Sequence, residues 1–461
     1  MRIGSYALTM LGTIWSIGPL PALGAAPHPT SERQLVTSVA TAPRIAMQFA
    51  QAEAASTRAA RVRAVTKNEA ENESGVKPDG CGTPHEYERQ DKPSGAARLN
   101  ASFALDLLAG LSSKAENLSV SPFGVTAVLS TLDLGADATM RKAIAATLRV
   151  GSGPGRIEQL RREARLINLA SQRDPRRFAS YNGVFVDHRL PLKPGIADLA
   201  KSEADVDLRS IEFTSRSGID EVNGLLAKKT GGRISSILDP GGAPLLVVAN
   251  AFAFKDCWKT PFDKGATASK PFTRSDGSRV ERPTMSVTSE SIGYRSDGRY
   301  VTVELPYVDE EFALTLVLAQ SAPGKVADFK EAAALLAGTD LADARVTLSL
   351  PKFGGSADND LLDVLSAMGL KSGLASSNQL PGFADGLVLG RARQKIWLAV
   401  DEAGTQAAAI TSVEATRNAE RPKQVTANFD KPFIYALRHR PTGTILIAGY
   451  VGDPDEGKDE K

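Results

Sequence analysis

Few side chains in this chain of 461 residues have the types and spacing that catalysis requires. A hydrolase needs a nucleophile and a base, yet no Gly-x-Ser-x-Gly motif is present, and two of the four histidines, His28 and His85, precede the main apolar part of the sequence. His439 could serve as a base only by a coincidence of the fold. The sequence also contains no zinc motif and no phosphate-binding glycine loop. We therefore expect no enzymatic activity, no metal and no cofactor.

Two weaker signals for site chemistry lie in the N-terminal part. His85-Glu86-Tyr87-Glu88 contains metal-ligating residue types, but it is more simply a solvated stretch. Cys81 and Cys257 are the only cysteines. In an oxidising compartment they could form a disulfide, although no spacing argument requires it and unpaired thiols are the alternative.

The stretch 400–422 is almost free of large apolar side chains, although apolar, strand-like runs flank it. Read as a strand from Thr405, it has one small, nearly uncharged face and one mostly polar face, as in a half-buried strand. The small face carries Thr405, Ala407, Ala409, Thr411, Val413 and Ala415. Alanine has weak strand propensity, and Gly404 supplies a flexible pivot. The pattern predicts a loop that is able to become a strand; a solvated loop rich in Ala and Thr is the alternative.

Composition is that of an ordinary soluble globular protein, and the net charge of +2 gives no general attraction to nucleic acid or membranes. Residues 1–26 have the features of a signal peptide: a basic residue, an apolar run too short to span a bilayer, and small residues near the end. Residues 27–92 have few large apolar side chains, which predicts a flexible linker. We expect one folded domain at 93–455, an acidic tail at 456–461, and export to an extracytoplasmic compartment.

Apolar periodicity predicts the elements that position the stretch 400–422. An amphipathic helix is indicated by apolar residues at Leu99, Phe103, Leu107 and Leu111. A short strand from Asn117 leads into a helix with Ser121 as its cap and Pro122 in its first turn. That helix is apolar nearly all round, which predicts a place in the core. Residues 245–254 predict a strand buried on both faces, and 218–238 predict a further helix.

The order and spacing of these motifs resemble the serpin family of protease inhibitors. Glu402-Ala403-Gly404-Thr405-Gln406-Ala407-Ala408-Ala409 resembles the serpin hinge, and Phe429-Asp430-Lys431-Pro432-Phe433 resembles the strand after the reactive loop. The resemblance covers about residues 95–455, with further matches at 117–136, 245–262 and 438–446. It implies an α+β fold with a large mixed β-sheet, helices and a mobile reactive-centre loop.

The resemblance also implies a mechanism, in which the cut loop inserts into the central sheet and carries a covalently trapped protease with it. The implied hinge residues are Glu402, Gly404, Thr405, Gln406, Ala407, Ala408 and Ala409. The commonest loop length puts Asn418 in the protease pocket and Ala419 after it, whereas a loop one residue shorter puts Arg417 there. Because proteases that accept Arg are common, we favour the bond Arg417–Asn418 and a trypsin-like target. A non-inhibitory serpin with a binding or structural role is the alternative.

Two further sites are implied by the resemblance. The region that controls sheet opening in serpins is matched here by Ser121, Asn250, Gln394 and Trp258. Gly124 stands where the family usually has a second serine, and Gln394 where it usually has a histidine; a glutamine can both donate and accept a hydrogen bond. The Arg-rich residues 156–177 correspond to a helix that binds polyanions in some serpins, which implies a polyanion site at Arg161, Arg162, Arg165 and Arg173. A solvated basic face is the alternative.

Overall fold

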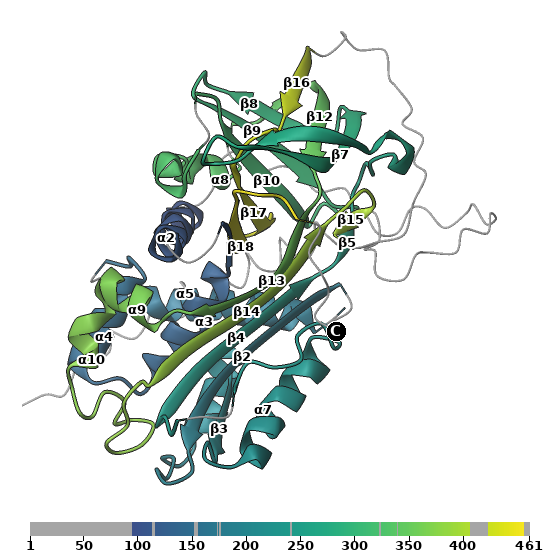
Figure 1. The fold of residues 1–461 in the computed structure, drawn as a ribbon. Helices are drawn as coiled ribbons and strands as arrows, with labels where there is room; N and C mark the ends of the chain where they lie inside the picture. Colours follow the sequence, from purple (N-terminus) through teal and green to yellow (C-terminus); the bar gives the residue numbers. More distant parts are fainter. Residues whose placement is uncertain are drawn as a thin grey trace, which may run out of the picture. The chain divides into compact units, whose positions relative to one another are not determined.

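A computed structural model describes residues 95–112, 116–151, 155–172, 174, 177–239, 242–321, 324–338, 340–405 and 423–455 (Figure 1). All of these belong to one compact unit, Val76–Lys461. They form helices and several sheets in an α+β arrangement, which confirms the predicted fold class. The longer helices are α2 (Gly95–Leu111), α3 (Pro122–Leu132), α4 (Ala138–Thr147), α5 (Arg156–Ser171), α6 (Ile196–Ala204) and α7 (Arg216–Lys229). The short ones are α8 (Ala333–Leu336), α9 (Leu362–Leu365), α10 (Lys371–Leu374), η1 (Lys264–Ala266), η2 (Val326–Phe329) and η3 (Ser366–Leu370).

The central sheet has five strands among the described residues, in the order β13 (Phe353–Asp360), β14 (Arg391–Val400), β4 (Leu246–Phe254), β2 (Phe178–Asp187) and β3 (Asp207–Ile211). Every residue of β4 is buried, as its apolar sequence predicts. Helix α7 covers one face of the sheet, and α3 and α5 lie against the other (Figure 1). We call the parallel pairing of β14 with β4, from Arg391 opposite Val247 to Trp397 opposite Ala253, the seam.

Two other large sheets complete the strand architecture within the described ranges. The first runs in the order β1 (Asn117–Val120), β18 (Thr444–Val451), β17 (Phe433–His439), β10 (Phe312–Ala319), β9 (Tyr300–Pro306), β8 (Gly293–Ser296) and β11 (Ala342–Asp343). The second runs in the order β16 (Gln424–Asn428), β12 (Arg345–Pro351), β7 (Arg279–Ser289) and β6 (Ala268–Thr273). A two-stranded pairing joins β15 (Gly404–Thr405) to β5 (Asp256–Cys257).

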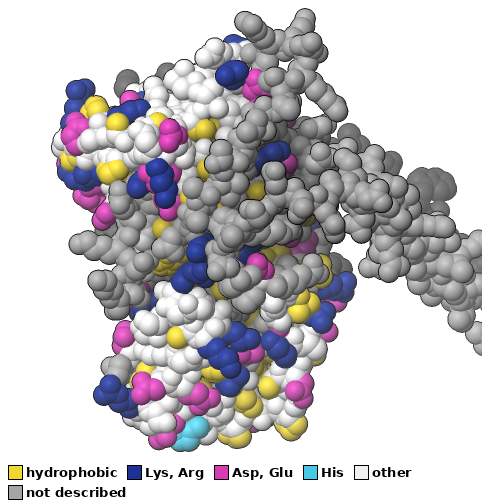
Figure 2. Space-filling view, turned by 90° about the vertical axis from the view of Figure 1, so that its right-hand side faces the viewer, with side chains coloured by type: hydrophobic (Ala, Val, Ile, Leu, Met, Phe, Trp, Pro, Cys, Tyr) yellow, Lys and Arg dark blue, Asp and Glu magenta, His cyan; other side chains and the backbone are white. Residues whose placement is uncertain are grey.

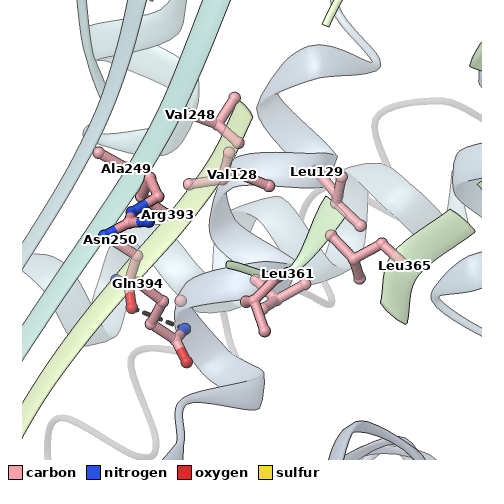
Figure 3. Close-up of a pocket in the computed structure, with 12 residues that line it drawn as sticks. Val128, Leu129, Val248, Ala249, Asn250, Leu361, Leu365, Arg393 and Gln394 are labelled. Carbon is pink, nitrogen blue, oxygen red and sulfur yellow. Dashed lines mark hydrogen bonds between the residues drawn. The ribbon is translucent and has the colours of Figure 1, made fainter. Parts of the chain in front are cut away.

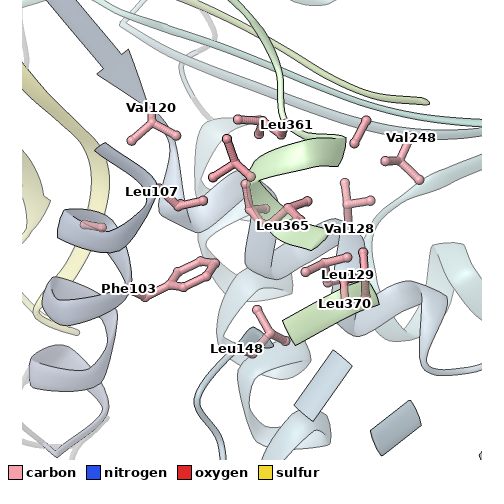
Figure 4. Packing of buried hydrophobic residues seen from close by; sticks show 14 of the residues in the cluster. Phe103, Leu107, Val120, Val128, Leu129, Leu148, Val248, Leu361, Leu365 and Leu370 are labelled. Carbon is pink, nitrogen blue, oxygen red and sulfur yellow. The ribbon is translucent and has the colours of Figure 1, made fainter. Parts of the chain in front are cut away.

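Helix α3 lies in the core, as its sequence predicts. All of its residues are buried, its first residue is Pro122, and the Ser121 hydroxyl caps it by accepting a hydrogen bond from Gly124 N at 3.0 Å. Around it, Phe103 and Leu107 of α2 pack with side chains of α9 in a continuous apolar cluster (Figure 4). The helix therefore forms a fixed support below the seam.

Two predicted helices differ in detail from the structure. Helix α7 ends at Lys229 rather than near Leu238, because Gly231 and Gly232 adopt positive φ angles and end the helical path. In α2, Leu99 was expected on the buried face but is 40 % exposed.

Candidate functional site

The predicted hinge begins at the end of the seam. After Val400 the chain turns and forms β15, in which Gly404 lies opposite Cys257 and Thr405 opposite Asp256 of β5, the continuation of β4 (Figure 1). Thr405 is fully buried, and its hydroxyl lies 2.7 Å from the Tyr307 hydroxyl. A Cβ atom on Gly404 would lie 2.0 Å from the Asp256 carbonyl oxygen, so this close backbone approach requires glycine. The first hinge residues therefore already occupy a strand position.

A hydrogen-bonded turn holds the hinge in this position. The Asp401 carboxylate accepts hydrogen bonds from Ala403 N at 2.9 Å and Gly404 N at 3.2 Å. Trp258 Nε1 donates to the Asp401 carbonyl at 2.9 Å, and the Trp258 ring stacks on Tyr307 with centroids 4.5 Å apart. Burial raises the pKa of Asp401 against the opposing effect of its two amide donors. Trp258, which the family resemblance places in the sheet-opening region, thus supports the turn from which the predicted hinge starts.

Glu402 fixes the opposite side of the same turn. Its carboxylate accepts a hydrogen bond from the Thr267 hydroxyl at 2.8 Å and lies 3.2 Å from Lys352 Nζ. Burial acts to raise the pKa of Glu402, but the Thr267 hydroxyl, a backbone amide and the Lys352 ammonium outweigh it, and the pKa lies below its usual value. The ionised carboxylate therefore stabilises the turn.

The predicted sheet-opening residues meet across the seam. Gln394 Nε2 donates to Asn250 Oδ1 at 3.0 Å (Figure 3). It also donates to the Ser121 carbonyl at 3.0 Å, and Gln394 Oε1 accepts from Ser121 N at 2.8 Å. Gln394 is fully buried, so each of these bonds satisfies a group that water does not reach. The glutamine that replaces the family's usual histidine thus bonds both to the facing strand and to the cap of α3.

The hydrogen bonds continue beyond the residues that sequence reasoning identified. Asn250 Nδ2 donates to Asn182 Oδ1 at 2.7 Å, and Asn182 Nδ2 donates to Asn168 Oδ1 at 3.1 Å. Gln394, Asn250, Asn182 and Asn168 therefore form a buried series of four side chains, which we call the amide chain, in which each NH₂ group donates to the next carbonyl oxygen. It crosses β14, β4 and β2 and ends on α5. Sequence reasoning could have found Asn182, because a polar asparagine stands out in the largely apolar strand β2.

Gly124 makes room for the amide chain. A Cβ atom at this position would lie 2.1 Å from Asn250 Oδ1, so a serine here would require the asparagine to move. Beside Gly124 lies a cavity of about 20 Å³ lined largely by apolar side chains, among them Val128, Val248 and Leu365 (Figure 3). The seam therefore covers a small unfilled space, whereas protein interiors are otherwise closely packed.

A buried ionic cluster lies beneath the hinge. Arg177 Nε donates to the carboxylate of Asp256 at 2.7 Å, and its Nη2 lies 2.5 Å from Asp309. Burial raises the pKa of Asp309, while the neighbouring Arg177 opposes that shift. In contrast, the bond from His439 lowers the pKa of Glu311. Because Asp256 pairs through its backbone with Thr405, this cluster fixes the strand against which the hinge lies.

The remaining predicted residues fall into two groups. Gln406, Ala407, Ala408, Ala409, Arg417, Asn418, Ala419 and Arg173 lie outside the described residues, as do the leader, the linker, the acidic tail and the stretch His85-Glu86-Tyr87-Glu88. Cys81 also lies outside them, so its pairing with Cys257, which is buried, stays a prediction.

Arg161 corrects the predicted polyanion site. It is only 6 % exposed, and its guanidinium donates to the Ser130 carbonyl of α3 at 3.0 Å. Arg162 and Arg165 are exposed on α5, and Arg162 pairs with Glu158. Among the described side chains on the face drawn in Figure 2, basic and acidic groups are interspersed. Arg161 is therefore a structural residue and cannot contribute to a surface site.

His439 lies in a turn contact. Its Nδ1 is 2.9 Å from the Thr442 hydroxyl and its Nε2 is 3.2 Å from Glu311, and the ring is 8 % exposed. Thr442 Oγ1 also accepts from Thr444 N at 3.3 Å, which ties the hydroxyl to the turn.

None of the described helices is long and apolar enough to cross a membrane.

Comparison with known proteins identifies the family. The sequence model of the family described as "Serpin (serine protease inhibitor)" matches residues 98–454. The chain belongs to the serpin family. Members are in general inhibitors of proteases rather than enzymes.

Serpin relatives and solved serpin structures agree with this assignment. Serpin-Z1C of Triticum aestivum is 32 % identical over 385 residues, which cover 76 % of this chain and 94 % of the relative. Glia-derived nexin of Homo sapiens is 27 % identical and covers 74 % and 88 %. Among solved structures, native protease nexin-1 with heparin has a TM-score of 0.65 at 22 % identity, covering 78 % of this chain and 99 % of that one. Human thyroxine-binding globulin complexed with thyroxine has a TM-score of 0.69 at 24 % identity, covering 78 % and 99 %. These structures share the fold.

Proposed function

We propose that this serpin is an exported inhibitor of a trypsin-like serine protease, which acts by cleavage of its reactive loop, covalent trapping of the protease and insertion of the loop into the seam. The observation that carries the proposal is the pairing of Gly404 and Thr405 with β5. A hinge that already forms the start of a strand at the end of the seam can extend that strand without first finding its register.

The pairing of β15 also predicts the register of the inserted strand. Continued without a shift, Thr405 opposite Asp256 leads to Thr411 opposite Asn250 and Val413 opposite Val248. The Thr411 hydroxyl would then reach the amide chain where Gln394 and Asn250 separate. Val413 would arrive at the cavity that Val248 lines. The small, uncharged face of 405–415 therefore matches what lies beneath the seam.

Strand direction supplies part of the driving force. The seam is a parallel pairing, and a strand that returns from β15 would run antiparallel to both β14 and β4. One parallel ladder would be replaced by two antiparallel ladders, which are slightly more stable per residue. At about 0.5 to 1.5 kcal/mol for each added hydrogen bond, ten inserted residues release of order 10 kcal/mol, comparable with the whole stability of a protease domain.

Arg417 is the proposed specificity residue, with Asn418 following the cut bond; the alternative bond is Asn418–Ala419. Incubation with trypsin-like proteases should yield an SDS-stable complex, and mass spectrometry of the released C-terminal fragment should find Asn418 at its start. Arg417→Ala should abolish inhibition of these proteases but leave insertion after a cut elsewhere in the loop intact. A fragment that starts at Ala419 would support the alternative bond, and a start outside both positions would contradict the loop register.

Export, the polyanion site and the inhibitory role itself rest on separate observations. Export rests on the leader-like residues 1–26, and N-terminal sequencing of mature protein should find a start near residue 25 or 27. A polyanion site is retained only at Arg162 and Arg165 with Arg173, and the relative solved with heparin is what favours it. A non-inhibitory binding role is the alternative, which the neighbour solved with thyroxine illustrates; a failure to form protease complexes would favour it.

A further inference from the structure

A second pocket lies at the edge of the central sheet, away from the hinge. We call it the lateral pocket; it has a volume of about 290 Å³, and its walls include Ser180, Asn182, Lys201, Asp207, Lys228 and Lys229. It forms because β3 is shorter than β2: Asp207 of β3 pairs with Gly183, so Ser180 and Asn182 lie beyond the start of β3. This volume is at the small end of the range for pockets that hold organic ligands.

The charges around the lateral pocket favour an anion. Its two aspartates are already compensated by two cations, because Lys201 Nζ lies 2.5 Å from Asp205 and 3.5 Å from Asp207, and Arg209 Nη2 lies 3.7 Å from Asp207. Lys228 and Lys229 are exposed in the last turn of α7, and neither forms an ion pair with any residue in the described part of the chain. Two ammonium groups therefore remain to bind a negatively charged ligand.

One wall of the lateral pocket is an end of the amide chain. The Ser180 hydroxyl donates to Asn168 Oδ1 at 2.9 Å, the same oxygen that accepts from Asn182. Ser180 is half-buried, so a ligand in the pocket can reach its hydroxyl. The other end of the amide chain is Gln394 in the seam. A polar contact at Ser180 is therefore connected to the seam by consecutive side-chain hydrogen bonds.

Because all the amides of the amide chain point the same way, its four side chains cannot rotate independently. Each NH₂ group faces the next carbonyl oxygen, so rotation of one amide would oppose two NH₂ groups or two oxygens unless its neighbours also rotate. Opening of the seam removes one of the two acceptors of Gln394 Nε2 and leaves Asn250 Oδ1 to find a new donor. Any contact that fixes Asn168 and Ser180 therefore opposes this rearrangement.

We propose that the lateral pocket binds a small organic polyanion that also carries a hydroxyl group, such as a hydroxytricarboxylate or a sugar phosphate, and that the bound anion slows insertion into the seam. The anionic groups of the ligand bind the lysines of α7, and its hydroxyl donates to Ser180 Oγ, whose own proton stays on Asn168 Oδ1, so the ligand holds the far end of the amide chain. The effect on insertion rests on the proposed function, whereas the binding itself does not.

Calorimetry with citrate as the probe tests the binding, with sodium chloride at equal ionic strength as the reference. We expect the double variant Lys228→Gln, Lys229→Gln to bind citrate roughly tenfold more weakly, as expected when ionic contacts are lost. The matched control is Lys142→Gln, Lys371→Gln, which removes the same charge from exposed positions elsewhere and should bind as the wild type does. If both double variants bind citrate equally well, or if citrate gives no heat above that of the sodium chloride reference, the lateral pocket is not an anion site.

The rate at which thermal resistance appears after the loop is cut tests the effect on insertion. Saturating citrate should slow this rate several-fold in the wild type but not in Lys228→Gln, Lys229→Gln. Ser180→Ala should keep most of the citrate binding and lose the slowing, because it removes the link to Asn168. Citrate binding with an unchanged insertion rate would overturn the regulatory part. If the protein fails to insert without citrate, the proposed function fails and the regulatory part with it, while calorimetry still decides the site.

Discussion

Strand β4 makes two contacts of different kinds with its neighbours. With β2 it forms nine antiparallel residue pairs, whereas with β14 it forms seven parallel pairs. Only the contact with β14 lies over a cavity beside Gly124 and ends at the hinge turn. In the proposed mechanism the β2 edge of β4 stays closed, whereas the shorter parallel pairing with β14 is the one that opens and is replaced by the inserted strand.

The largest expected effect is a rise in thermal stability when the loop is cut between Ser412 and Arg421. Insertion of 405–415 would fill the seam and leave the β2 contact unchanged, and of order 10 kcal/mol corresponds to a rise on the order of 20 °C in Tm. Differential scanning calorimetry before and after limited proteolysis measures it. An unchanged Tm after a clean cut would mean that the seam does not open, and the two edges of β4 would then be equivalent.

Thr405→Arg should convert the inhibitor into a substrate. Thr405 is fully buried beside Tyr307, and an unpartnered guanidinium there costs several kcal/mol, which prevents the inserted strand from starting. The stoichiometry of inhibition should rise several-fold while the rate of loop cleavage is kept. Thr405→Val, which is uncharged and similar in size, is the control. Normal complex formation by Thr405→Arg would show that insertion does not begin at this residue.

A pair of variants compares the two edges of β4 directly. Gln394→Leu leaves Ser121 N and Asn250 Oδ1 without their partner and should lower native stability by about 1 to 3 kcal/mol. Val184→Ala at the β2 contact should lower it by a similar amount through lost packing. After the loop is cut, only Val184→Ala should keep its full effect, because Gln394 then faces the inserted strand. Chemical denaturation of native and cut forms provides the test, and equal losses in both forms for Gln394→Leu would argue against the exchange.

The smallest expected effect is the pH dependence of stability that comes from Glu402 at the end of the seam. The pKa of Glu402 is lowered in the folded state, so its contribution to stability is present above the ordinary value of 4.5 and is lost as the pH falls through the lowered pKa. Glu402→Gln should therefore lower the free energy of unfolding by about 1 kcal/mol at pH 7 and by less at pH 3. Asp401 and Asp309 have raised pKa values, so their contributions to stability change with pH in the opposite direction. Both residues are present in the wild type and in Glu402→Gln, so these contributions cancel from the difference between the two proteins. A difference that grows on acidification would contradict the role of the ionised carboxylate.

The sequence predicted those parts of the site that depend on local patterns. Ser121 as a cap, the buried strand β4 and the strand-like start at Thr405 each follow from residue type and period, and the structure contains all three. The seam itself could not be predicted from periodicity, since the parallel pairing of β14 with β4 joins residues that are 144 positions apart, such as Arg391 and Val247. Its residues were found through the family resemblance instead.

Two residues show what a count of residue types misses. Arg161 was assigned to a basic surface because arginines are frequent in 156–177, yet it follows the period of the buried face with Ala164 and Asn168. Helical periodicity could have separated it from Arg162 and Arg165. Gly124 was recognised as a departure from the family, but its reason depends on the position of the Asn250 side chain in three dimensions.

Strand β1 pairs with β18, so Asn117 lies opposite Val451, and the Asn117 side chain also donates to the Asp453 carbonyl at 2.6 Å. This contact joins the first strand of the described part of the chain to the last. On a ribosome, the five strands of the central sheet have all been translated before β18 emerges. The seam is thus available to early pairings while the seven-stranded sheet still lacks two of its inner strands, β17 and β18. Arrival of β17 and β18, and not assembly of the central sheet, therefore sets the moment at which the seven-stranded sheet can close.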